Sequence, residues 1–255
     1  MGVGMGRLSP LWAEPQFPTC LIGQSRLRFR AQQQITGRAD VAVLGSGISF
    51  GRFSEAPWPE LLARRSGLQL RNLAVPQTGP EAWVQDDDLM ALAARSSLQL
   101  VEVPSCLRVS NRFWQLHPRR SDRIVRVLPG LISLYPELDL AEVVFAGHLL
   151  RLLESICPRR FDLIRDAAEQ AWLDRMNGLL AELPGPVVLL WLHFPQPRAL
   201  SPGADLVQAL RSKVRAVVEV KVTPDRDAAG PAVHFPDAAS HSRIAERLSH
   251  LSDLI

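Results

Sequence analysis

The chain has 255 residues, of which 47% are hydrophobic and 22% are charged. Such a chain can bury a sizeable core, which excludes wholesale disorder. The formal net charge of +3 at pH 7 is too small to indicate nucleic-acid binding by itself. Only Lys213 and Lys221 are lysines, so 27 of the 29 basic residues are arginines. This bias fits a GC-rich genome, or a site that binds anions through guanidinium groups.

Residues 1–38 lack a clear period and are predicted to form an N-terminal arm laid over the rest of the chain. Within this arm, Leu27–Arg30 alternates like a short edge strand. Residues 39–255 are predicted to form a single α/β domain. Its five apolar runs predict parallel strands at Val41–Leu44, Leu68–Leu73, Leu98–Val103, Val187–Leu192 and Ala216–Val222. Helices are expected at Trp58–Ser66, Asp86–Ser97, Ile124–Leu134, Asp139–Ile156, Arg159–Leu183, Asp205–Val214 and Ser240–Leu251.

Alternating strands and helices predict a three-layer α/β sandwich around a parallel sheet, either SGNH-hydrolase-like or flavodoxin-like. Both faces of the sheet should be covered, because the strand runs are apolar throughout rather than alternating. Residues 104–186 depart from this pattern. They contain a long loop and several predicted helices but no convincing strand. We therefore expect a helical insertion, or a cap, beside the sheet edge.

The sequence lacks the motifs that would predict a disulfide framework, a metal site, a dinucleotide cofactor or a membrane span. Three scattered cysteines, Cys20, Cys106 and Cys157, fit neither a disulfide framework nor a zinc motif, and they favour a reducing cytoplasm. The longest apolar run, Val187–Leu192, is too short to span a bilayer. No histidine pair has metal-ligand spacing, and the Gly45-Ser-Gly47 turn lacks the third glycine of a dinucleotide fingerprint. We expect no metal, no cofactor, no nucleic-acid partner and no membrane span.

The most informative segment is the buried strand Val41–Leu44, which runs directly into Gly45-Ser46-Gly47. In an open parallel sheet, ligands collect where strands end at the carboxyl edge. The hydroxyls of Ser46 and Ser49 are candidate nucleophiles there. Acyl transfer also needs a base and oxyanion donors. The C-terminal segment offers Asp237 and His241 as catalytic partners, and Asn72 after the second strand is a candidate substrate-binding residue.

A second polar motif follows the third predicted strand. Its candidate binding residues for a phosphate, sulfate or carboxylate are Asn111, Arg112, His117, Arg119 and Arg120, with Arg123 nearby. An equally simple interpretation is a solvated basic turn before the Ile124–Leu134 helix, with Asp122 near its N-cap. The sequence leaves both interpretations open.

The order of these motifs resembles the SGNH (GDSL-type) hydrolases over residues 40–250. Gly45-Ser46-Gly47 with Gly51 stand at the family's first block, Asn72 at the second, and Asp237 with His241 at the last. The alignment on Gly51 puts the family serine at Gly47 and places Ser46 where the family has aspartate. The resemblance implies an SGNH-like scaffold with a degenerate or altered site.

The chain also resembles an uncharacterised alphaproteobacterial family, a domain of unknown function, over nearly its whole length. The signature residues are the arm from Phe17–Cys20 to Arg30, Gly51–Phe53, Asn72-Leu73, Ser110–Phe113, His117–Arg120 and Asp122-Arg123. This resemblance implies a bacterial origin and a shared fold, and it supplies no reaction.

Taken together, the sequence predicts a protein that binds or acts on a small anionic or acylated ligand, or a saccharide. Three hypotheses remain, and they leave open whether it is an enzyme. One is a serine esterase or acyl transferase that uses Ser46 or Ser49 with His241. Another is a non-catalytic anion-binding module built on Arg119 and Arg120. The last is a group-transfer enzyme for a sulfated or phosphorylated donor.

Overall fold

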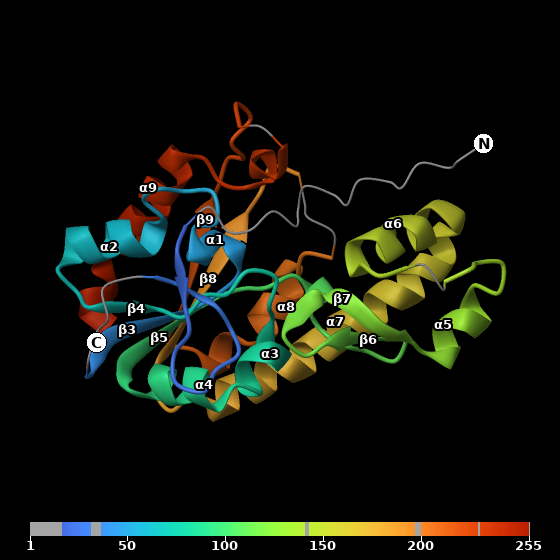
Figure 1. The fold of residues 1–255 in the computed structure, drawn as a ribbon, viewed down its shortest axis with the longest axis horizontal. Helices are drawn as coiled ribbons and strands as arrows, with labels where there is room; N and C mark the ends of the chain where they lie inside the picture. Colours follow the sequence, from blue (N-terminus) through green and yellow to red (C-terminus); the bar gives the residue numbers. More distant parts are fainter. Residues whose placement is uncertain (1–16, 32–36, 141–142, 197–199, 229, 255) are drawn as a thin grey trace.

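A computed structural model describes residues 17–31, 37–140, 143–196, 200–228 and 230–254. A parallel sheet lies at the centre of the larger part of the molecule (Figure 1). Its strands are β3 (Ala39–Leu44), β4 (Leu70–Asn72), β5 (Ser96–Glu102), β8 (Val187–His193) and β9 (Ala216–Lys221). Each is parallel to its neighbours in the order β4-β3-β5-β8-β9. The predicted α/β fold with a parallel five-stranded sheet is confirmed.

This strand order fixes where a ligand site is expected. The first strand of the sheet along the chain, β3, lies between the second and the third, which is the flavodoxin-like order. The connections after β3 and β5 therefore leave in opposite directions. A crevice opens between them at the carboxyl edge, and open α/β sheets bind ligands at this position.

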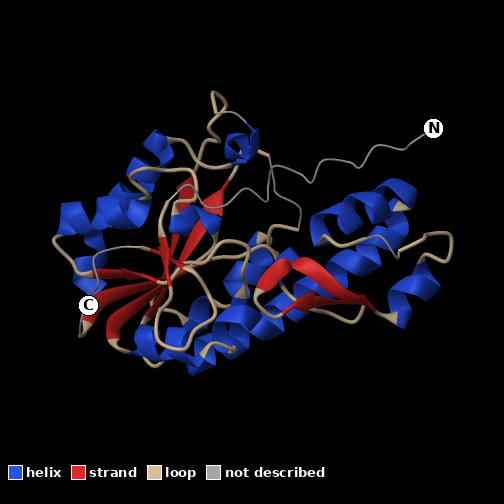
Figure 2. Ribbon diagram, in the orientation of Figure 1, coloured by secondary structure: helices blue, strands red, loops and turns tan. Residues whose placement is uncertain are grey.

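Helices cover both faces of the sheet (Figure 2). Val41 and Val43 of β3 pack with α2 (Trp58–Ser66) and α9 (Ala238–Arg247) on one face. Ala42 and Leu44 point to the other face, toward α3 (Pro80–Val84), α4 (Asp87–Ala94), α7 (Pro158–Glu182) and α8 (Ala204–Ala209). Successive residues of a strand face opposite sides, so burial on both faces requires an apolar residue at almost every position.

The predicted insertion projects from one side of the sheet (Figure 1). It contains α5 (Pro129–Leu134), α6 (Ala146–Ile156), the first part of α7, and the antiparallel hairpin of β6 (Trp114–His117) and β7 (Arg120–Val127). Two predictions are wrong here, because this region was expected to lack strands and Ile124–Leu134 was expected to be one helix. Pro129 starts α5 and disfavours helical backbone at Leu128. The β-branched residues before it are in β7 instead.

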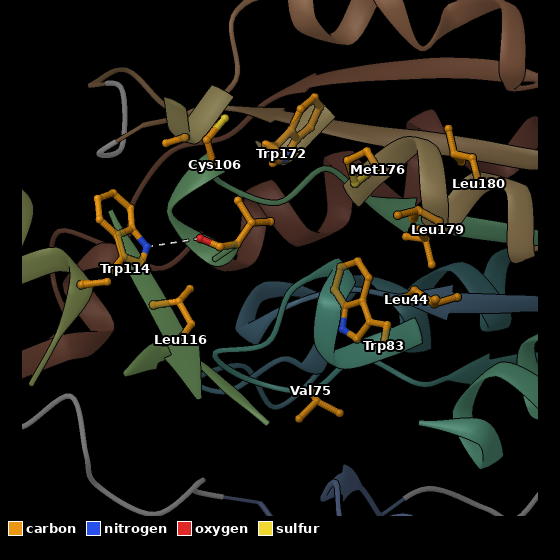
Figure 3. Close-up of a cluster of buried hydrophobic side chains, with 14 of the residues drawn as sticks. Leu44, Val75, Trp83, Cys106, Trp114, Leu116, Trp172, Met176, Leu179 and Leu180 are labelled. Atoms are coloured by element: carbon orange, nitrogen blue, oxygen red, sulfur yellow. Dashed lines mark hydrogen bonds between the residues drawn. The ribbon is translucent and has the colours of Figure 1, made fainter. Parts of the chain in front are cut away.

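The insertion and the sheet share one apolar core. Leu44 of the sheet, Trp83, Trp114 and Trp172 are all fully buried and belong to the same cluster, as Figure 3 shows. The indole N–H of Trp114 donates to the Val109 carbonyl at 3.3 Å, which is the dashed line in Figure 3. The indole N–H of Trp172 on α7 donates to the carbonyl of Pro104 at 2.9 Å. These bonds join the insertion to the segment that follows β5.

The described part of the N-terminal segment contains β1 (Thr19–Cys20) and β2 (Phe29–Arg30), which pair with each other. Ser25 donates to Asp86 at 2.7 Å, and Arg30 donates to the Gly51 carbonyl at 2.9 Å. The boundary of the predicted arm at residue 38 stays a prediction. Short elements complete the described chain: α1 (Gly47–Phe50) and the 3-10 turns Cys106–Arg108, Arg211–Lys213, Gly230–His234 and Ser249–Leu254. Within the described residues, the helices are too short or too polar to cross a bilayer.

Candidate functional site

The turn after β3 is built from residues with little or no side chain. A Cβ on Gly45 would lie 2.7 Å from Ser49 Oγ and 2.8 Å from Glu102 Oε2, so only glycine fits. Ser46 follows, and the short helix α1 begins at Gly47. It ends at Gly51, which has the left-handed φ of 73° that glycine adopts most easily. The turn therefore places the backbone of α1 close to the end of β5.

Glu102, the last residue of β5, joins the two strands that flank the crevice. Its side chain is buried, with the residue 5% exposed. Oε1 accepts a hydrogen bond from Ser46 Oγ at 2.5 Å. Oε2 accepts three, from Ser49 Oγ at 2.5 Å, Ser49 N at 3.1 Å and Ser46 N at 3.2 Å. One carboxylate thus fixes both candidate serine hydroxyls and satisfies two backbone donors at the start of α1.

A cavity of about 190 Å³ opens beside this carboxylate. Loops that follow β3, β5 and β8 all contribute to its wall. Its polar side chains are those of Ser46, Glu102, Ser105, Arg108 and Ser201, and its apolar side includes Ile48, Trp191 and Phe194. Drug-sized ligands occupy pockets of about 300–1,000 Å³. This cavity, which we call the edge cavity, is therefore suited to a smaller molecule or to one end of a larger one.

Arg108 is the cationic group of the edge cavity. It ends the 3-10 turn Cys106–Arg108, and its Nη1 atom is buried with no hydrogen-bond partner among the described residues. Burial lowers the pKa of the Arg108 guanidinium, while the carboxylates of Asp122 and Glu102 raise it. An arginine keeps its charge at neutral pH in any of these surroundings. Arg108 thus lines the cavity as a partly buried cation, and its Nη1 is a buried donor with no partner in the described part of the chain, whereas buried donors normally have partners.

The hairpin of the insertion supplies further charges near Arg108. Asp122 on β7 is the main electrostatic partner of Arg108, and Arg120 also lies close enough to affect it. Arg120 forms an ion pair with Asp122 at 3.6 Å and donates to Gln77 Oε1 at 3.0 Å. Gln77, in the loop after β4, has a left-handed φ of 63°. Such strain in a non-glycine residue is often found at functional sites.

The structure brings Asn72 to the turn rather than into the edge cavity. Its side-chain amide donates to the Ser49 carbonyl at 2.8 Å, and its Oδ1 accepts from Ala74 N at 3.1 Å. Asn72 is buried and lies at the end of β4. Its predicted substrate contact stays a prediction, and its observed hydrogen bonds hold the serine-bearing turn against β4.

His241 and Asp237 make other contacts in this structure. Nδ1 of His241 accepts a hydrogen bond from the backbone N–H of Trp58 at 3.2 Å, at the start of α2. Asp237 is the N-cap of α9 and accepts from Ser240 N at 2.6 Å. Among the described residues, each serine hydroxyl is bonded to Glu102 and neither is bonded to His241. The predicted catalytic pairing is thus not formed here.

The predicted arginine motif is spread along the hairpin. Asn111 Oδ1 accepts from Phe113 N at 2.9 Å and stabilises the turn before β6. Arg112 lies over the ring of Phe113, at the end of the hairpin where β6 starts. The opposite end has three of the predicted binding residues, His117, Arg119 and Arg120. Nδ1 of His117 accepts from the backbone N–H of Arg119, and His117 is paired with Arg120 across the two strands. Arg120 is the member of the motif that reaches the surroundings of Arg108.

Two residues of this site, Glu102 and Arg108, were not predicted from the sequence. Glu102 had a visible signal, because it is the one charged residue in the apolar run Leu98–Val103 and it stands at the carboxyl end. Arg108 had a weaker one, as an arginine in the first loop after that strand. Among the described residues, no group of three or more histidine, cysteine, aspartate or glutamate side chains is placed to hold a metal ion.

Comparison with known families identifies the chain. Residues 9–252 match the family described as a domain of unknown function, DUF6473. The chain belongs to the DUF6473 family. This finding confirms the predicted resemblance to a domain of unknown function. No curated protein matches the DUF6473 chain in sequence.

Solved structures with an overall likeness to this DUF6473 protein include two esterases and a lipolytic protein. An acetyl xylan esterase, Est2A, from the rumen bacterium Butyrivibrio proteoclasticus has a TM-score of 0.44 at 12% identity, over 88% of this chain and 66% of that one. A protein assigned to the lipolytic G-D-S-L family from Desulfitobacterium hafniense has a TM-score of 0.44 at 10% identity, over 83% and 98%. A family two carbohydrate esterase from Cellvibrio japonicus has a TM-score of 0.41 at 11% identity, over 89% and 63%. This chain thus spans about two thirds of the length of the two carbohydrate esterases. At such low identities and TM-scores, these likenesses establish no shared reaction.

Proposed function

We propose that the protein binds a small ligand through a carboxylate or acyl oxygen in the edge cavity. The observation that carries the proposal is the buried Nη1 of Arg108, which has no partner among the described residues, on an arginine that lines the same cavity as Ser46. The cavity lies at the switch between β3 and β5, where open α/β sheets bind ligands. Origin in a bacterium and a cytoplasmic location stay predictions from the sequence.

A ligand oxygen would give Arg108 Nη1 the acceptor that the described residues do not supply. A buried donor without a partner costs about 1–3 kcal/mol, and a hydrogen bond to a charged group contributes about 1.5–3 kcal/mol. An oxygen that accepts from Arg108 would remove this cost. A compound too large for the cavity would place only its acyl or carboxylate end there.

Calorimetric titration with acetate, propionate and lactate tests the proposal. Arg108→Gln should weaken binding about ten- to hundredfold, which corresponds to the loss of one charge-assisted bond. Arg119→Ala is the matched control, because Arg119 is an exposed arginine in the hairpin turn. Equal affinities of the wild type and the Arg108→Gln variant would refute the role of the edge cavity.

A second candidate function, acyl transfer by Ser46, is favoured by the 2.5 Å hydrogen bond from Ser46 Oγ to Glu102 Oε1. Three of the four hydrogen bonds to this carboxylate are accepted by Oε2, so Ser46 Oγ is the one donor to Oε1 among the described residues. In this candidate, Ser46 Oγ attacks an acyl carbonyl and Glu102 Oε1 takes its proton. The proton then passes to the leaving group, and Arg108 stabilises the oxyanion.

Labelling with a fluorophosphonate probe separates this candidate from binding alone. A Glu102-assisted nucleophile predicts labelling at Ser46 that is lost in Glu102→Gln and kept in His241→Asn. Labelling that depends on His241 would support the pairing predicted from sequence. If no serine is labelled, the edge cavity is a binding site without this chemistry.

A further inference from the structure

The charged groups around the edge cavity limit the negative charge that its ligand can carry. Glu102 forms part of the cavity wall, and its buried carboxylate faces the same space as Arg108. Any anion bound by Arg108 is therefore also close to a fixed negative charge. Four hydrogen bonds from Ser46 and Ser49 hold the Glu102 carboxylate in this position, so a simple reorientation cannot relieve this repulsion.

The second cation near the cavity, Arg120, already has partners. Arg120 is paired with Asp122 and donates to Gln77. Asp122 is in turn the main electrostatic partner of Arg108. Among the described residues, the two arginines near the site are therefore opposed by two carboxylates. Arg108 can balance one negative charge of a ligand, and a second charge would be left without a partner and repelled by Glu102.

The remaining arginines of the predicted motif do not change this balance. Arg112 stacks over Phe113 at the far end of the hairpin, and Arg123 lies over Phe145. Arg119 lines a different surface hollow, together with the acidic run Asp86–Asp88. Among the described residues that line the edge cavity, Arg108 is therefore the one arginine.

We infer that the ligand of the edge cavity carries at most one negative charge, and that the site discriminates against phosphorylated compounds. The inference rests on the proposed function and narrows its ligand class to monocarboxylates and uncharged acyl compounds. Specificity of this kind arises from fixed like charges that oppose the wrong ligand.

Parallel titrations with acetate and inorganic phosphate test the inference at mildly alkaline pH and matched ionic strength, where phosphate is a dianion. Wild-type protein should bind acetate at least tenfold more tightly than phosphate. Asp122→Asn removes one negative charge and keeps the shape of the side chain. It should improve phosphate binding by more than tenfold, with a smaller effect on acetate. Asp174→Asn is the matched control, since Asp174 is exposed on α7 and lines a different groove.

The outcomes separate the inference from the proposed function. If phosphate binds as tightly as acetate and both are lost in Arg108→Gln, the ligand class is wrong while the site is right. If Asp122→Asn leaves the preference for acetate unchanged, the charge argument is wrong. If neither acetate nor the other small acyl compounds bind, the proposed function fails and the inference fails with it.

Discussion

Acidification should destabilise the protein through one buried histidine. His241 is 3% exposed, and its Nδ1 accepts a hydrogen bond from the backbone N–H of Trp58. Trp58 is the first residue of α2, where backbone N–H groups have no partner within the helix. Burial lowers the pKa of His241 to about 4, with a smaller opposing effect from Asp237 and a reinforcing one from Arg30. Once protonated, Nδ1 becomes a donor that faces another donor.

The sign and size of the effect follow from linkage. The pKa of histidine in an unfolded chain is about 6.5, so between about pH 6.5 and pH 4 the unfolded state binds more protons than the folded state. The stabilisation is therefore complete above about pH 6.5 and is lost as the pH falls toward 4. At about 1.4 kcal/mol per pKa unit, the difference between the two pKa values corresponds to about 3 kcal/mol of unfolding free energy.

Urea unfolding, followed by tryptophan fluorescence between about pH 7 and pH 4, measures this loss. His241→Asn is the control, because the asparagine oxygen can accept from the Trp58 N–H and does not titrate. The carboxylates that both proteins share cancel in the comparison. Wild type should lose about 3 kcal/mol more than the variant across this range. A difference between the two proteins that is constant with pH would refute the reasoning.

Three further substitutions test how the site and its supports are built. Gly45→Ala should destabilise the protein by about 1–3 kcal/mol and abolish acetate binding, because the new Cβ meets Ser49 Oγ at 2.7 Å; a normal melting temperature with intact binding would contradict this. Gly178→Ala on α7 should instead stabilise by about 0.4–1 kcal/mol in thermal unfolding, since nothing lies within 4 Å of the added Cβ. Asp86→Ala should cost about 1 kcal/mol in the same assay, because Asp86 is the N-cap of α4 and accepts from Leu89 N.

The sheet was predictable because its signal is local. Each of the five apolar runs corresponds to a strand, since a strand buried on both faces must be apolar at nearly every position. The position of the site was predictable for a related reason. Ser46 follows a buried strand through a turn that only small residues can form, and the strand order puts that turn at the carboxyl edge.

The partners within the site were not predictable, because they come from distant parts of the chain. The serines meet a carboxylate more than 50 positions away, and His241 meets a backbone amide 183 positions away. The density of arginines between residues 112 and 123 suggested that they converge. A hairpin, however, holds its two ends apart. The hairpin was not predicted, because residues of its second strand were assigned to a helix at Ile124–Leu134.

The long helix α7 belongs both to the projecting insertion and to the layer that packs against the sheet. Its 25 residues extend about 37 Å. Near its N-terminus, Arg160 donates to the Leu134 carbonyl at the end of α5, and toward its C-terminus Met176 and Leu179 are buried in the core shared with the sheet. The helix therefore both supports the insertion and covers part of one face of the sheet. A shortened chain without residues 104–186 would lack α7 and would expose an apolar face of the sheet. We therefore expect such a shortened chain to aggregate.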